Sequence, residues 1–177
     1  MRNLIMILIL AIVLVSCEKI GDSKTPNIPA NDSIDIDNDL VYDYLIRYSS
    51  IATTDIPPSH QSITGAIKPL NDNKILYRES VGNLFLVAGD TIRQVDNTNA
   101  DWSVYSASVI GINGSQDKWD DDWKIVSDLT NNFYLGVQLK KEDDLKIGWI
   151  LLGLDKENGS ISILENKLTS EPELIIK

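Results

Sequence analysis

Short runs of apolar residues alternate with clusters of Asp, Asn, Gly and Pro over most of the chain after residue 41. Runs of this length, rich in Ile and Val and bounded by turn residues, are typical of β-strands. Turns are expected at Pro57-Pro58, Asn71-Asp72-Asn73, Gly89-Asp90, Asn113-Gly114, Glu142-Asp143-Asp144 and Asn158-Gly159. The predicted strands are Tyr42–Tyr48, Ser62–Ile67, Lys74–Arg78, Asn83–Ala88, Thr91–Val95, Trp102–Ile112, Phe133–Lys141, Leu145–Leu154, Ser160–Glu165 and Glu173–Ile176.

The last third of the chain has the clearest strand pattern. Apolar residues recur at every second position in its first segment, namely Phe133, Leu135, Val137 and Leu139. An acidic turn and then Asn158-Gly159 separate this segment from the next two apolar runs. A period of two places alternate side chains on opposite faces, so these runs predict a three-stranded antiparallel meander with one buried face.

Two motifs in this meander resemble the C-terminal half of β-sandwich modules in secreted bacterial proteins. They are Tyr134-Leu135-Gly136-Val137 and Gly148-Trp149-Ile150-Leu151-Leu152. The composition favours the same class, because 24 Ile and 10 Val stand against only 7 Ala and 7 Glu. We therefore predict an all-β chain with a single antiparallel, jelly-roll-like β-sandwich, in which 120–129 is the segment best suited to a short helix.

The N-terminus has a different pattern. After Arg2, every residue from Leu4 to Val15 is apolar. A helix of this length spans roughly 18 Å at about 1.5 Å per residue, which is shorter than a hydrocarbon core of about 30 Å. The segment therefore predicts the hydrophobic region of a signal peptide rather than a permanent membrane span.

The segment ends in Leu14-Val15-Ser16-Cys17. This motif resembles the lipobox of bacterial lipoproteins, and no family is indicated for the body that follows it. The resemblance implies cleavage before Cys17, palmitate-type acyl chains on this residue, and a place in the cell envelope at the outer membrane. Two or three acyl chains hold a protein firmly on a membrane. The alternatives are a cleaved secretory signal with an incidental Cys and a retained membrane helix.

The residues after Cys17 are polar and contain Pro26 and Pro29. Such a stretch buries too little apolar surface to offset the entropy of ordering it, so we expect a flexible linker. The predicted organisation is a signal peptide over 1–16, the lipidated Cys and linker over 17–33, and a β-sandwich over 34–177.

The net charge and the low numbers of Cys and His exclude several classes of function. The 26 acidic and 16 basic residues give a formal charge of −10, which argues against a nucleic-acid partner, since phosphate binding needs a basic surface. One Cys excludes an internal disulfide framework and a Cys-rich zinc site. With one His and no recognisable nucleophile motif, no catalytic residue is predicted.

An acidic segment at residues 35–43 is the candidate metal site. Its Asp residues alternate in a way that resembles calcium loops of extracellular modules, and calcium prefers six to eight oxygen ligands. Leu40 stands where such loops usually need Gly, and the alternative is a solvated acidic turn. The candidate ligands are Asp35, Asp37, Asp39, Asp43 and the carbonyl of Val41.

Trp119 and Trp123 flank three consecutive Asp residues. They predict either an exposed aromatic platform for a sugar or a protein partner, or a loop that is anchored to the sandwich by its Trp side chains. The sequence as a whole favours a non-catalytic binding or structural module of the envelope, with a glycan or a protein as partner. A small polysaccharide hydrolase and an accessory subunit of an outer-membrane complex are the alternatives.

Overall fold

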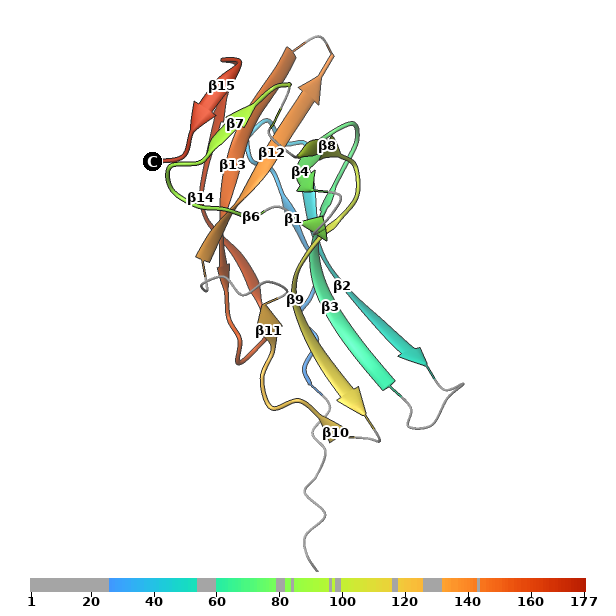
Figure 1. Ribbon diagram of the computed structural model, residues 1–177. Helices are drawn as coiled ribbons and strands as arrows, with labels where there is room; N and C mark the ends of the chain where they lie inside the picture. The colour runs from blue at the N-terminus through green and yellow to red at the C-terminus, as the bar shows by residue number, and fades with distance from the viewer. Residues whose placement is uncertain are drawn as a thin grey trace, which may run out of the picture.

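The computed structural model describes residues 26–53, 60–78, 82–83, 85–95, 97, 100–115, 118–125, 132–142 and 144–177. All regular secondary structure in these ranges is β-strand, arranged in antiparallel sheets that pack together (Figure 1). The prediction of an all-β sandwich is therefore confirmed. The short helix expected over 120–129 is wrong for the part of that segment that is described, because Lys124–Ile125 pair with a neighbouring strand.

The first sheet contains the N-terminal hairpin. Its order is β1-β2-β3-β9-β10, and β11 also pairs with β9. Strands β2 and β3 pair along ten residues each without a register shift. The strands of this sheet are β1 (Asp32–Ile34), β2 (Tyr44–Thr53), β3 (His60–Pro69), β9 (Ala107–Ser115), β10 (Lys118–Trp119) and β11 (Lys124–Ile125).

The second sheet is built around the predicted meander. Its order is β14-β13-β12-β4-β5, with β6 beside β12 and β8 beside β4. The consecutive antiparallel pairing of β12, β13 and β14 confirms the meander, but the expectation of one buried face is wrong for β13, which is buried on both faces. The strands of this sheet are β4 (Lys74–Arg78), β5 (Gly82–Asn83), β6 (Phe85–Leu86), β8 (Asp101–Ser103), β12 (Asn132–Lys141), β13 (Asp144–Leu154) and β14 (Ile161–Thr169).

The main core lies between these two sheets. The alternate residues of β12 named by the sequence pattern are all buried there, together with Ile46 and Ile63 of the first sheet. A small third sheet, formed by β7 (Thr91–Arg93) and β15 (Glu173–Ile175), lies against the outer face of β13. Its side chains bury Ile147 and Trp149 in a second cluster, so the fold has three layers at this point.

Three of the predicted turns are confirmed, whereas Pro57-Pro58 lies outside the described residues. Asn71, Gly89 and Gly159 all have positive φ, as expected for tight turns that end one strand and begin the next. The predicted strand Trp102–Ile112 is split, because Val104 and Tyr105 are exposed between β8 and β9.

The hairpin turn expected at Asn113-Gly114 is wrong, since both residues lie within β9. A Cβ on Gly114 would be 2.9 Å from the Trp119 ring, so Gly is required there by the close approach of an indole and not by a turn.

The loop between β1 and β2, residues 35–43, contains the acidic segment. β1 carries the chain upward in Figure 1 to this loop, and β2 carries it back down. The loop therefore lies at one end of the sandwich and the start of the described chain at the other (Figure 1). The Tyr44 hydroxyl lies 2.9 Å from the Lys74 carbonyl and 3.1 Å from the Gln138 carbonyl, which ties the base of the loop to the second sheet.

Candidate functional site

The acidic loop owes its shape to hydrogen bonds from Asp side chains to its own backbone. The Asp35 carboxylate accepts the N–H groups of Asp39 (3.3 Å) and Leu40 (2.8 Å). The Asp39 carboxylate accepts the N–H of Val41 at 2.9 Å. Asp favours such turns because its short side chain reaches backbone groups a few residues away. The alternating Asp residues thus act first as turn formers.

Asp43 fixes the loop to the body of the protein. It is buried, and its carboxylate accepts the N–H of Ile36 at 2.9 Å and the side-chain amide of Asn73 at 3.3 Å. Desolvation raises the pKa of Asp43 above its ordinary value, although these hydrogen bonds act in the opposite direction. The side-chain oxygen Oδ1 of Asn73 also accepts the N–H of Lys140 at 3.1 Å, so the same network reaches strand β12.

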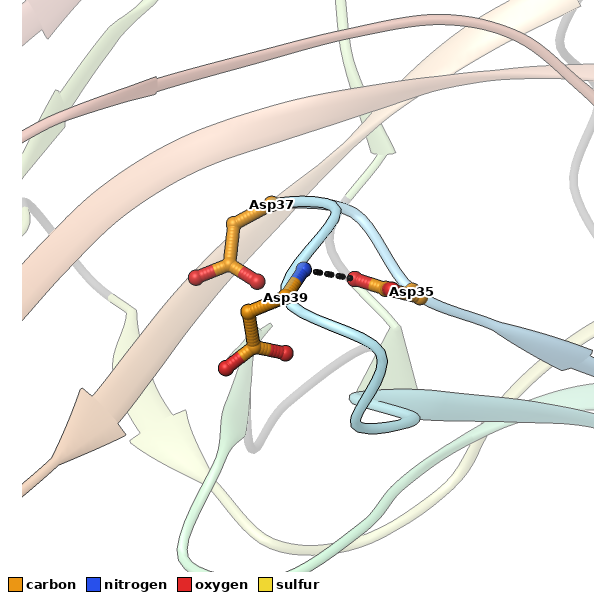
Figure 2. Close-up of side chains that lie close together, drawn as sticks. All are labelled: Asp35, Asp37 and Asp39. Atoms are coloured by element: carbon orange, nitrogen blue, oxygen red, sulfur yellow. Dashed lines mark hydrogen bonds between the residues drawn. The ribbon is translucent and has the colours of Figure 1, made fainter.

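Three carboxylates of the loop converge. Oxygen atoms of Asp35, Asp37 and Asp39 all lie within 4.8 Å of one another (Figure 2). The ammonium of Lys141, at the end of β12, donates to Asp37 at 2.7 Å and also to Asp39. A cation of the protein itself therefore neutralises part of this cluster.

The pKa shifts agree with that ion pairing. Desolvation lowers the pKa of Lys141, but its hydrogen bonds with Asp37 and Asp39 outweigh this effect and raise the pKa above its ordinary value. The hydrogen bond from Lys141 lowers the pKa of Asp39. Both groups are thus held in their charged forms at neutral pH.

Only part of the predicted calcium ligand set converges. Of the predicted ligands, the structure brings Asp35, Asp37 and Asp39 together, but the Asp43 carboxylate faces Ile36 and Asn73 instead. The Val41 N–H donates to the Asp39 carboxylate. Calcium requires six or more oxygens around one point, whereas here an ammonium already binds two of the three converging carboxylates.

The two Trp residues have different environments. Trp123 is 3% exposed and contacts the Tyr48 ring edge-on, with ring centroids 6.3 Å apart. It also lies against Gly159, where a Cβ would come within 2.1 Å of the indole. Trp119 is partly buried and packs on the main core over Gly114. Trp123 is therefore a packing residue, and the two indoles do not form an exposed platform.

The tip of the acidic loop presents apolar side chains to solvent. Leu40 is 93% exposed, and Val41 and Tyr42 are 50% and 58% exposed. Leu40 also has a φ of 72°, in the left-handed region that favours Gly. We name Leu40–Tyr42 the apolar tip. Sequence reasoning missed it because three apolar residues after an acidic turn have the same pattern as the start of a buried strand.

A polar groove borders the loop on its other side. It has a volume of about 430 Å³ and lies between the loop and the ends of β13 and β14. Asp37 and Asn38 line it from the loop, and Lys146 and Lys167 line it from the sheet. Charges of both signs thus meet beside the acidic cluster.

Cys17 and the rest of residues 1–25 lie outside the described residues. Within the described ranges, no helix is long and apolar enough to cross a membrane. Comparison with protein-family models, with curated proteins and with solved structures gives no match.

Proposed function

We propose that this chain is a lipid-anchored protein of the bacterial cell envelope, and that its β-sandwich is a non-catalytic binding module for another protein. The apolar tip is the contact surface of this proposal. The observation that carries it is the placement of an exposed Leu on a left-handed backbone position, at the end of a loop that is fixed by hydrogen bonds.

The energetics of Leu40 support a partner. A left-handed conformation costs an L-residue about 1–2 kcal/mol. At 93% exposure the Leu40 side chain recovers almost none of this by burial within the chain. Strained residues that also expose apolar surface are typical of binding sites, where a partner supplies the missing contacts.

The chemistry around the tip indicates what kind of partner fits. The exposed Leu40, Val41 and Tyr42 match an apolar pocket. The Asp35 carboxylate, which accepts backbone N–H groups of the loop, lies near them, so a pocket with basic residues at its rim complements the tip. A protein surface has both features. A glycan partner is less well supported, because Trp123 is buried rather than available for stacking.

The lipobox motif supports the anchoring part of the proposal. The described chain starts at the end of the sandwich opposite the acidic loop (Figure 1). A tether attached there through Cys17 would hold the apolar tip away from the membrane surface. This arrangement also suits an accessory subunit of an envelope complex, in which the binding partner is another subunit.

Site-specific photo-crosslinking tests the contact surface. A photoreactive phenylalanine derivative replaces Tyr42 in one variant and Leu164, a similarly exposed residue on β14, in the control. In intact cells, we expect a discrete crosslinked product from position 42 that is absent from position 164. The product should weaken when Leu40→Ser is added. No product at 42, or the same products at both positions, would contradict the proposal.

Detergent partitioning tests the anchor separately. The wild-type chain should enter the detergent phase, and Cys17→Ser should leave the mature, unacylated domain in the aqueous phase or stop processing of the leader. If the chain with Cys17→Ser partitions and matures as the wild type does, the lipid anchor is refuted, whatever the crosslinking shows.

A further inference from the structure

Part of one edge of strand β2 has no pairing partner among the described residues. Strand β1 pairs only with Tyr44–Ile46, and beyond this pairing the Asn31 side chain accepts the N–H of Tyr48 at 2.9 Å. From Ser49 to Thr53, no strand among the described residues pairs with this side of β2. In Figure 1, β2 continues to the lower right, away from β1 and from the described residues 26–31 that precede it.

The hydrogen bonds show which backbone groups face this edge. The Tyr48 N–H points outward, since it donates to Asn31. The Asp43 carbonyl points to the β3 side, since it accepts the N–H of Leu70 at 2.9 Å. Backbone groups of successive residues in an antiparallel strand alternate between its two sides. Ser50 and Ala52 therefore direct their N–H and C=O groups outward, and Ser49 and Ile51 direct theirs to β3.

This edge lacks the usual protection against pairing. At the edge of the second sheet, β14 carries the exposed Glu165 and Lys167, and its pairing with β13 has a register shift. Such charges and bulges discourage the addition of another strand. Residues 49–53 of β2 contain neither a charge nor a Pro, are all exposed, and keep a regular register with β3.

We propose that this edge of β2 pairs with the same edge of a second copy of the chain, antiparallel and about a two-fold axis at Ile51. Ser50 of each copy then faces Ala52 of the other, and their outward N–H and C=O groups satisfy one another. Ile51, which is 66% exposed, loses its solvent contact against Ile51 of the second copy.

Charge favours a second copy at this place. The chain has a net charge of −10, so most surfaces of two copies repel each other. Residues 49–53 are uncharged and allow close approach. The pairing adds backbone hydrogen bonds along one short strand, so we expect a weak dimer that crosslinking can capture and that does not depend on the apolar tip.

The register makes a geometric prediction. With the axis at Ile51, the two Ile51 residues form a non-hydrogen-bonded pair, whose Cα atoms lie about 4.5 Å apart. Ser49 lies on the same face of the strand and is also exposed. It is offset from its counterpart by four residues, which places the two Cα atoms at least roughly 13 Å apart. A disulfide needs Cα atoms within about 7 Å.

Cysteine crosslinking tests the proposal on the full chain in mild detergent. The background is Cys17→Ser, which removes the native thiol, and the two variants add Ile51→Cys or Ser49→Cys. Under a mild oxidant we expect at least ten times more disulfide-linked dimer from Ile51→Cys than from Ser49→Cys. Ala52→Pro removes an outward N–H and no bond to β3, so it should abolish the Ile51→Cys dimer while the circular dichroism spectrum stays unchanged.

Three outcomes would contradict the proposed pairing. Equal crosslinking of the two variants would mean random collision and would overturn the proposal. No dimer from Ile51→Cys, or a dimer that persists with Ala52→Pro, would show that this edge does not pair in the stated register. The apolar tip is unaltered in every variant, so failure here leaves the proposed partner contact standing, and failure of that contact leaves this dimer standing.

Discussion

Removing the Trp123 side chain should be among the most damaging single changes in this protein. The indole is 3% exposed, contacts Tyr48 edge-on and covers Gly159. Truncation of a buried Trp to Ala usually costs about 3–5 kcal/mol, and domains of this size are stable by only about 5–15 kcal/mol. With a urea dependence near 2 kcal/mol per molar, the unfolding midpoint of Trp123→Ala should fall by roughly 1.5–2.5 M.

A double-mutant cycle with Gly159 examines the same packing from its other side. Gly159 has a φ of 70°, and a Cβ there would lie 2.1 Å from the Trp123 ring. Gly159→Ala should therefore cost about 2–4 kcal/mol, from backbone strain and overpacking together. Once Trp123 is Ala, the clash is gone and only about 1 kcal/mol of strain should remain. The double variant should thus be more stable than the sum of the single changes predicts.

The assay is urea unfolding followed by circular dichroism, with Trp119→Ala as the matched control. Trp119 is only partly buried, so its loss should cost less than half as much. A Trp123→Ala variant with near wild-type stability, or strict additivity with Gly159→Ala, would refute the packing role. The indole would then be free for the binding role that the sequence also allowed.

Further predictions concern the acidic loop. Leu40→Gly should raise the free energy of unfolding by about 0.5–1 kcal/mol, because relief of left-handed strain exceeds the added chain entropy; urea unfolding checks this, and destabilisation would contradict it. Asp43→Ala should cost about 1–3 kcal/mol by leaving the Ile36 N–H buried without an acceptor, and an unchanged urea midpoint would argue against this. Lys141→Gln should lower the urea midpoint at neutral pH. Because the pKa of Lys141 is raised from its ordinary 10.5 and that of Asp39 is lowered from 3.8, the difference from wild type should persist between these values; it should shrink as pH falls below 3.8 or rises above 10.5. Thermal melts with calcium and with a chelator should coincide, since a bound ion would raise the melting temperature.

The meander was predictable because its strands and turns are determined by residues that are close together in the sequence. The alternation of apolar residues in β12 and the turn at Gly159 each depend on neighbours in sequence. The same holds for the turn at Asn71, which ends β3. Where strand pairing follows chain order, as from β12 to β14, the sequence pattern also predicts the neighbours.

The candidate site was only partly predictable because its contacts are distant in sequence. The Asp residues of the loop could be recognised as a group, but Lys141 lies 102 residues from Asp39 along the chain. No local pattern indicates that its ammonium would reach them. Likewise, the burial of Trp123 depends on Tyr48 of β2 and on Gly159 in the turn between β13 and β14, both distant from it in the sequence. The charge balance of the loop thus depends on the end of β12, a strand far away in the sequence.

The small sheet of β7 and β15 has a consequence for biogenesis. Leu174 and Ile176 are buried in the second cluster, and the Ile176 N–H donates to the Asp90 carbonyl at 3.0 Å. During synthesis, this layer stays incomplete until residue 176 has left the ribosome, and Trp149 lacks part of its cover until then. The nascent chain therefore exposes the apolar outer face of β13 until the residues of β15 have been synthesised and can pack on it.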